Sequence, residues 1–95
     1  MFVVLLKFSN NKDQAGRFME GHKAWLTRGF ADGVFLVAGT LDSGAGGGIL
    51  AHGATRAEIE ARVGEDPFVA GDVVTAEIHE IAASRADDRL GFLLS

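Results

Sequence analysis

The sequence predicts a single α+β domain whose elements follow the order β-α-β-β-α-β along 95 residues. Three observations point to this fold class. Runs rich in β-branched and aromatic residues are typical of strands. Two segments carry apolar residues at helical spacing. A glycine-rich stretch joins two of the apolar runs, as in a β-hairpin. This order predicts the ferredoxin-like arrangement, a four-stranded antiparallel sheet with two helices on one face.

The first strand is predicted over residues 2–8, FVVLLKF. Its side chains alternate between the two faces of the sheet, and both sets are apolar: Phe2, Val4, Leu6 and Phe8 on one face, Val3 and Leu5 on the other. A strand that is apolar on both faces needs cover on both sides. Since the helices cover only one face, we expect a homodimer that packs sheet on sheet, a dimeric α/β barrel.

The first helix is predicted over residues 12–28, because its apolar residues lie on one side at about 100° per residue. These residues are Ala15, Phe18, Met19, Trp25 and Leu26. The preceding stretch SNNKDQ offers helix N-caps. The following stretch RGFADG is expected to end the helix, with Gly29 and Gly33 as the residues that break it.

The remaining elements are two strands of a hairpin, a short helix and a last strand. The strands are predicted over 34–41 and 46–53, and the helix over 55–64. Thr55, followed by Glu58 three residues later, forms a capping-box pattern. The last strand lies in DVVTAEIHEIA, at 72–82. We therefore expect one domain over 1–95, with a core at about 1–82 and a loose extension or packing arm at about 83–95.

Composition argues against several classes of function. The chain has no cysteine, which excludes disulfides and thiolate chemistry. The formal net charge is -4 with both signs interspersed, so no basic stripe supports nucleic-acid binding. The apolar opening run is too short to span a membrane, which takes about 20 residues, and it lacks the pattern of a signal peptide. We expect a cytoplasmic protein without nucleic-acid or membrane partners.

His22 is a candidate catalytic residue because it falls on the apolar side of the predicted first helix, near Phe18 and Trp25. A buried polar side chain there needs a hydrogen-bond partner. One interpretation is a satisfied core histidine. The other is a general acid or base oriented by a carboxylate.

Asp66 is the candidate carboxylate. It precedes Pro67, the single proline of the chain, and proline pushes the residue before it out of the helical region. Asp66 therefore lies in the connection between the second helix and the last strand, which can approach the first helix. The alternative is that Asp66 only caps a short turn through Pro67 and Phe68.

Further residues are candidates for binding a small organic molecule, anionic or aromatic. Trp25, Phe68 and Phe35 are expected as apolar pocket walls, with Gly39 and Thr40 offering backbone and hydroxyl contacts. Arg17 and Lys23 flank His22 on the helix and either attract an anionic ligand or are simply solvated.

No metal site and no cofactor are expected. No pair of histidines has the spacing of a metal site. His52 and His79 are less distinctive than His22, although His79 lies on the mixed face of the last strand, where it is a candidate for the dimer interface. The run GAGGG lacks the lysine and helix of a phosphate-binding loop and favours a hairpin turn.

Several of these stretches together resemble the YciI-like (YCII-related) proteins, small ferredoxin-like domains that form dimeric α/β barrels. The matching pieces are FVVLLKF, RFMEGHKAWL, GVFLVAGTL and GEDPFVAGDVV, over about residues 1–82. The resemblance implies that His22 and Asp66 correspond to the histidine and aspartate proposed as the active-site pair of that family. The glycine run at 44–48 and the apolar end LGFLLS depart from the family pattern.

Two functions follow from these residues. The first is a small-molecule enzyme without cofactor, in which a His22–Asp66 dyad moves a proton in an isomerisation, elimination or hydrolysis. The second is a non-catalytic dimeric binding or accessory protein, in which the same pair is structural and ties the last strand to the first helix. Fold alone does not choose between them.

Overall fold

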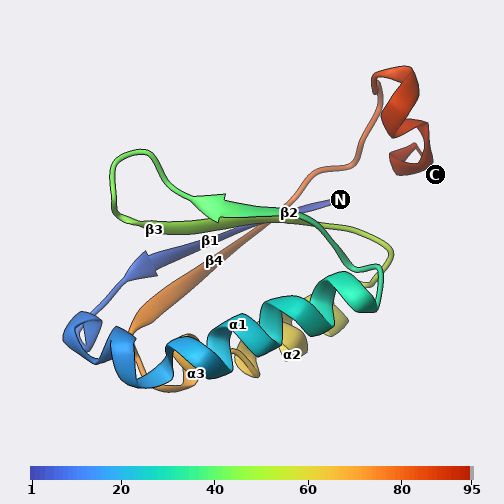
Figure 1. Cartoon of the computed structure of the whole chain (residues 1–95). Helices are drawn as coiled ribbons and strands as arrows, with labels where there is room; N and C mark the ends of the chain where they lie inside the picture. Colours follow the sequence, from blue (N-terminus) through green and yellow to red (C-terminus); the bar gives the residue numbers. More distant parts are fainter. Residues whose placement is uncertain (95) are drawn as a thin grey trace.

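The computed structural model of the chain describes residues 1–94 and contains one four-stranded sheet (Figure 1). The strands are β1 (Phe2–Phe8), β2 (Phe35–Thr40), β3 (Gly46–Ala51) and β4 (Val74–Glu80). The helices are α1 (Ala15–Ala31), α2 (Arg56–Gly64) and α3 (Pro67–Ala70), with 3-10 turns η1 (Lys12–Gln14) and η2 (Asp88–Leu93).

The strand order is β2-β3-β1-β4, and every neighbouring pair is antiparallel. All three α-helices lie on one face of the sheet (Figure 1). This order and layering confirm the predicted α+β, ferredoxin-like fold class. Within one chain the sheet is open, with β2 and β4 as its edges.

The core lies between the sheet and the helices. Phe2, Val4 and Leu6 of β1 are buried there, as their alternation predicted, whereas Phe8 at the end of the strand is partly exposed. Trp25 of α1 fills the centre, and its ring meets Phe35 of β2 edge to face, 5.1 Å between ring centroids. Such aromatic pairs add to the apolar area that they bury, so α1 is fixed against the sheet at Trp25.

The first helix differs from the prediction at both ends. Its N-terminal turn is the separate 3-10 turn η1, and α1 continues three residues beyond Arg28, to Ala31. Gly29 was expected to break the helix but lies inside it. A Cβ at Gly29 would overlap the Phe35 ring, so this glycine allows close packing. The helix ends before Gly33, whose φ of +74° is a conformation that favours glycine.

The predicted capping box at the start of α2 is confirmed. The Thr55 hydroxyl accepts from the backbone N–H of Glu58, and the Glu58 carboxylate accepts from the backbone N–H of Thr55. These hydrogen bonds, the backbone one first, lower the pKa of Glu58 below its ordinary value. Ile59 and Val63, one turn apart on α2, are both buried.

The stretch after α2 was expected to be a turn and is instead the one-turn helix α3. Asp66 is its N-cap, and Oδ1 accepts from the backbone N–H of Phe68 at 3.0 Å. Pro67 occupies the first helical position, where its missing N–H costs nothing. Four residues are too few for a periodic pattern, but the Asp-Pro pair is a good start for a helix.

The open face of the sheet carries an apolar row. Val3, Leu50 and Val37 form this row and are aligned across β1, β3 and β2 by their pairing, and His79 continues the line on β4. Val37 is 56% exposed. The predicted extension leads to η2, which projects away from the helices (Figure 1). Leu90 and Phe92 of η2 and Leu94 directly after it are exposed.

No helix among residues 1–94 is both long enough and apolar enough to cross a membrane.

Candidate active site between the sheet and the helices

His22 of α1 and Asp66 at the start of α3 are hydrogen bonded, with 2.8 Å between Nδ1 and Oδ1. The Asp66 side chain is fully buried, whereas the His22 side chain is 14% exposed. Because an ionised carboxylate only accepts, the imidazole donates from Nδ1, which leaves Nε2 of the neutral ring as a free acceptor. The pair thus presents one basic nitrogen.

Asp66 serves two elements at once. Its Oδ1 accepts from His22 and also from the backbone N–H of Phe68. Its Oδ2 is buried and has no hydrogen-bond partner among the described residues. The carboxylate therefore has only the His22 imidazole as a side-chain partner in the part of the chain that the structure describes.

The His22 ring is held by aromatic packing as well as by its hydrogen bond. It lies parallel to the Phe68 ring, 4.0 Å between centroids and 6° between planes. Trp25 stacks less closely, at 5.8 Å, and donates from Nε1 to the carbonyl oxygen of Arg62. The imidazole thus has a fixed plane, which is the condition for aiming one nitrogen at a bound molecule.

Gly21 sets how closely α3 approaches α1. A Cβ at this position would lie 3.0 Å from Pro67 Cγ, which is tighter than an ordinary contact. The missing side chain lets α3 pack next to His22. This close packing brings Asp66 within hydrogen-bonding distance of the imidazole.

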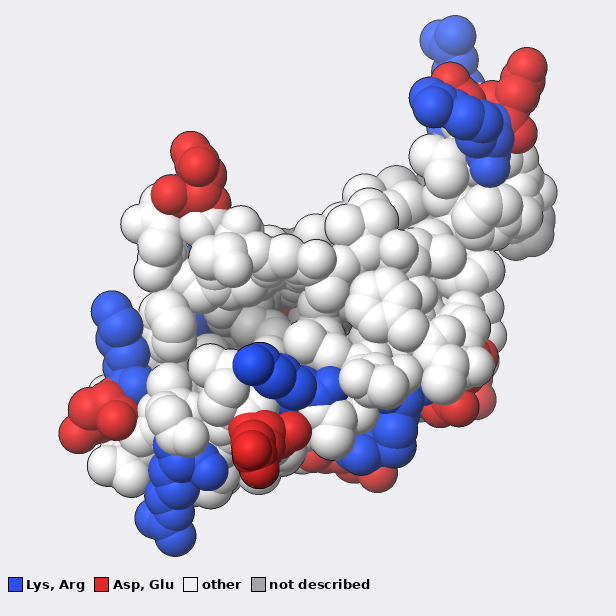
Figure 2. Space-filling model, viewed as in Figure 1, with Lys and Arg blue, Asp and Glu red and all other residues white. Residues whose placement is uncertain are grey.

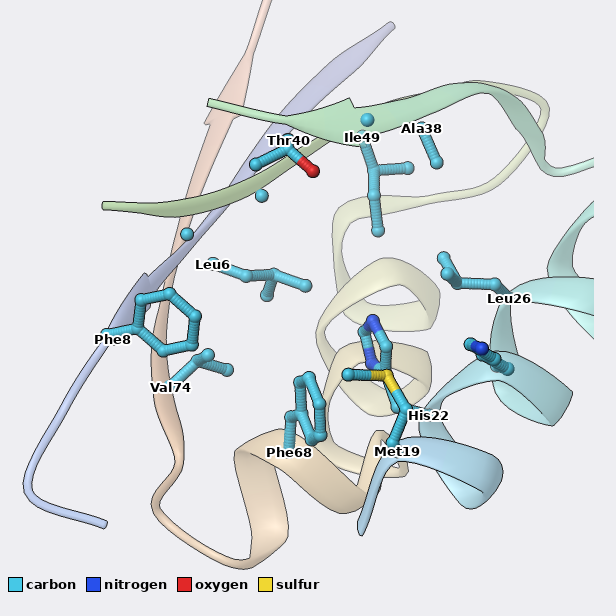
Figure 3. A pocket seen from close by; sticks show the side chains of 15 residues that line it. Leu6, Phe8, Met19, His22, Leu26, Ala38, Thr40, Ile49, Phe68 and Val74 are labelled. Carbon is cyan, nitrogen blue, oxygen red and sulfur yellow. The ribbon is translucent and has the colours of Figure 1, made fainter. Parts of the chain in front are cut away.

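A pocket of about 350 Å³ lies beside His22, between the sheet and the helix layer. Figure 3 shows Ala38, Thr40 and Ile49 projecting from the sheet toward Met19, His22 and Leu26 of α1. Phe68 forms one side wall, and Leu6, Phe8 and Val74 line the adjoining side. In the space-filling view a hollow walled mainly by uncharged atoms opens between the layers, with basic side chains at its rim (Figure 2). Its size suits a small molecule.

The floor of the pocket includes three successive glycines, 46–48 of β3. Gly46 has a φ of +145°, and a Cβ there would overlap the carbonyl oxygen of Leu6. Gly47 is paired with Leu6 and Thr40, both on the helix side of the sheet. A Cβ at Gly47 would lie 3.1 Å from the carbonyl oxygen of Gly39, which is tighter than an ordinary contact, and would meet no pocket side chain within 4 Å. Gly47 therefore presents bare backbone to the pocket.

The structure brings together most of the residues that the sequence singled out. His22, Phe68, Gly39 and Thr40 line the pocket, as does Lys23.

Three other candidates lie elsewhere. Trp25 and Phe35, both expected as walls, are buried in the core and do not line the pocket. Arg17 lies over the Phe18 ring, 5.2 Å from its centroid, and also lies outside the lining.

Sequence reasoning missed the glycine floor and the apolar walls formed by Met19 and Leu26. The last three residues of GAGGG were predicted to begin the strand at 46–53, and β3 confirms this, but their place at the floor of a pocket was not predicted. Three consecutive glycines inside a strand are a usable signal, because glycine in a strand often marks close approach of a ligand or another backbone. Met19 and Leu26 look like ordinary core residues, and their position at the pocket depends on the tertiary fold.

Among residues 1–94 no group of three or more His, Asp or Glu side chains is arranged to hold a metal ion. His52 and His79 lie away from His22. His52 meets Phe92 edge to face at 5.2 Å, and His79 pairs with Glu77 on the exposed face of β4.

Comparison with known proteins identifies a structural relative. A solved structure with a similar fold is 5-chloro-2-hydroxyhydroquinone dehydrochlorinase (TftG) from Burkholderia phenoliruptrix AC1100, in complex with 2,5-dihydroxybenzoquinone. The TM-score is 0.67 with 15% sequence identity, over 85% of this chain and 93% of that chain. No protein-family model matches the chain, and no curated protein matches its sequence. The likeness supports the ferredoxin-like fold, and the resemblance to the YciI-like proteins stays a prediction.

Proposed function

We propose that the protein is an enzyme that acts on a small organic molecule by proton transfer and needs no cofactor, with His22 as general base or acid and Asp66 as its partner. The observation that carries the proposal is the 2.8 Å bond between His22 Nδ1 and a fully buried carboxylate, at the wall of a pocket.

The proposed step uses Nε2 of His22. Asp66 accepts from Nδ1 and so holds the ring in the tautomer whose Nε2 is unprotonated. Nε2 takes a proton from the bound molecule, and the buried carboxylate stabilises the imidazolium that forms, as in other catalytic histidine–aspartate pairs. The imidazolium then returns the proton to another atom or to a leaving group.

The reaction classes that fit are isomerisation, elimination and hydrolysis. Elimination has one additional support, because the structural relative is a dehydrochlorinase. In an elimination of this type from a chlorinated hydroquinone, a hydroxyl proton first moves to the chlorine-bearing carbon, which gives the keto tautomer. His22 would then take a proton from a remaining ring hydroxyl, the ring electrons form a new carbon–carbon double bond, and chloride leaves with the electron pair of its carbon–chlorine bond. The products are the unsaturated compound, chloride and a protonated imidazole that water deprotonates.

The first test is a turnover screen with chlorinated and non-chlorinated hydroquinones, starting with 5-chloro-2-hydroxyhydroquinone, on the wild type and on His22→Gln. General acid–base catalysis is worth about 10²- to 10⁴-fold, so the variant should lose at least about 100-fold in turnover at a temperature where both proteins are folded. Equal turnover by the two proteins would reject His22 as the acid or base. ¹⁵N chemical shifts of the imidazole should show hydrogen on Nδ1 in the wild type and a mixed tautomer in Asp66→Asn.

A non-catalytic binding protein is the second candidate function. The observation that favours it is the double use of Asp66, which caps α3 and therefore has a structural task independent of any reaction. In this case His22→Ala lowers the melting temperature, and neither protein turns over any compound of the screen. Turnover that is lost at unchanged stability would exclude this function.

We further infer that the working form is a homodimer joined through the open sheet face. The apolar row of Val3, Leu50 and Val37 supports this inference, since an antiparallel sheet usually leaves a polar face to water.

A further inference from the structure

The pocket beside His22 has an unusual charge balance for this chain. The whole sequence has 13 acidic residues and 9 basic ones. Yet the residues that line the pocket include no Asp and no Glu, and their only titratable side chains are His22 and Lys23. Asp66, the nearest carboxylate in the dyad, is buried behind the imidazole and bonded to it. The lining is therefore apolar with one fixed positive charge.

Lys23 is available to a ligand. Met19, His22, Lys23 and Leu26 face the pocket from one side of α1, at the spacing i, i+3, i+4, i+7. In the part of the chain that the structure describes, Lys23 forms no ion pair with any carboxylate. A free ammonium group beside an apolar cavity attracts an anion, because the low-polarity walls screen its charge less than water does.

The opposite wall favours a flat molecule. Gly47 presents backbone without a side chain, and the Thr40 hydroxyl projects from the next strand into the same space (Figure 3). A planar group can lie on a peptide plane that has no Cβ above it. At about 350 Å³ the cavity is near the lower end of ligand pockets, so the molecule is about the size of one substituted ring.

We propose that the ligand of this pocket is a small planar organic anion, whose negative group is held by Lys23 while its ring lies on Gly47 and its edge faces Nε2 of His22. The chemical fate of this ligand rests on the proposed function, but its binding to the pocket does not. It assigns Lys23, and not Arg17, as the residue that selects for charge.

The experiment measures the dissociation constants of benzoate and of its neutral isostere benzamide by ¹H–¹⁵N NMR titration. In the wild type benzoate should bind about three- to fivefold more tightly, the range of a solvent-accessible ion pair, with the largest shifts at the backbone amides of Thr40 and Gly47. In Lys23→Gln the ratio of the benzamide to the benzoate dissociation constant should fall to about one. Arg28→Gln removes the same charge from α1 outside the pocket and should keep the wild-type preference.

Several results would overturn the proposal. They are equal affinities for the two compounds in the wild type, an unchanged preference in Lys23→Gln, the same loss of preference in Arg28→Gln, or no binding of either compound at millimolar concentrations.

A second variant tests the position of the ring. Gly47→Val fills the space above the glycine floor, so it should weaken both probes at least about tenfold. Its Cβ would lie 3.1 Å from the carbonyl oxygen of Gly39, so some loss of stability is expected, and the ¹H–¹⁵N spectrum must show that the variant is folded at the temperature of the titration. Unweakened binding would place the ligand elsewhere and contradict the proposal. Since neither probe reacts, these outcomes are independent of turnover: charge selection can hold in a protein that shows no catalysis, and catalysis can be found without it.

Discussion

At the scale of single residues, Phe68 makes two separate contacts in the site. Its ring stacks on the His22 imidazole, and its backbone N–H donates a hydrogen bond to Asp66. The two contributions can be separated, because a change of side chain leaves the backbone donor in place. The stacking contributes orientation to the imidazole, and the backbone hydrogen bond orients the carboxylate.

Phe68→Leu should remove the stacking and keep the Asp66 bond. Parallel aromatic contacts are worth about 0.5–1.5 kcal/mol beyond the area that they bury, so we expect a loss of about 1–2 kcal/mol in unfolding free energy, measured in urea. The His22 ring resonances should broaden or shift. The control is Phe92→Leu, whose side chain is 53% exposed and which should stay within about 0.5 kcal/mol of wild type. Unaltered His22 resonances in Phe68→Leu would contradict the assigned role of the stack.

Residue types and spacing singled out His22 and Asp66 as candidates, since a histidine on an apolar helix face and an acid before the single proline are both unusual. The structure places the two side chains in contact, and their catalytic role stays a prediction. Residue types and spacing were not sufficient to separate Lys23 from Arg17. Both flank the histidine on the helix, and the side on which each lies relative to the pocket depends on how α1 packs on the sheet. Trp25 fits either the core or the pocket by pattern, and its contact with Phe35 assigns it to the core.

At the scale of elements, the approach of α3 to α1 depends on Gly21. Gly21→Ala gains up to about 1 kcal/mol of helix propensity, but its Cβ would press on Pro67. We expect these effects to offset each other, with a stability near that of the wild type, while the His22–Asp66 bond lengthens and turnover falls.

Gly16→Ala is the matched control in the same helix, because no atom lies within 4 Å of its Cβ. It should be neutral or slightly stabilising and keep full turnover. Wild-type turnover and wild-type imidazole ¹⁵N shifts in Gly21→Ala would show that α3 can shift without disturbing His22. That result would contradict the role assigned to Gly21.

The capping box of α2 makes part of the stability dependent on pH. Because the folded-state pKa of Glu58 is lowered from 4.5 by the Thr55 hydrogen bonds, its contribution is present above about pH 4.5 and is lost as pH falls through the lowered value. Glu58→Gln should therefore be less stable than wild type at pH 7, and the difference should shrink toward pH 2–3. Urea unfolding at the two pH values measures it. A difference that stays constant with pH would mean that the charge has no part in the cap.

The predicted boundaries of the elements matched the structure where a local sequence signal was strong, as at Thr55. They differed where a tertiary contact determined the end of the element. Gly29 was predicted to break the helix. In the structure it lies inside α1, and the Phe35 ring packs in the space that a side chain at this position would occupy. The helix α3 has only four residues, which is too short for a periodic sequence pattern. Only the Asp-Pro start and the hydrogen bond from the Phe68 N–H to the Asp66 side chain distinguish it from a turn.

At the scale of the whole molecule, the open sheet face is the largest feature that one chain leaves unexplained. If it is the dimer interface, Val37→Lys places a charge in its apolar row and should convert a dimer to a monomer in sedimentation experiments at micromolar concentration. Ala24→Lys, on the exposed side of α1, should remain dimeric. A wild type that sediments as a monomer at millimolar concentration would reject the interface.

The overall topology was predictable because the strands are rich in β-branched and other apolar residues, the two longer helices carry apolar residues at helical spacing, and the order of these elements allows few arrangements. The structure of the extension beyond residue 82 was less predictable. Its apolar residues suggested a packing arm, but in the described chain η2 contacts the domain through the His52–Phe92 pair and leaves Phe92 and Leu94 largely exposed.

The two hydrogen bonds of Asp66 Oδ1 have a consequence for how such sequences diverge. Since the carboxylate is needed to start α3, selection for a folded protein alone preserves Asp-Pro-Phe, even in descendants that have lost catalysis. The His22 side chain bonds to no backbone group among the described residues, so its replacement costs the contacts with Asp66 and Phe68 but leaves the cap of α3 in place. Among homologous sequences, the histidine is therefore the better marker of retained chemistry, and the aspartate marks the fold.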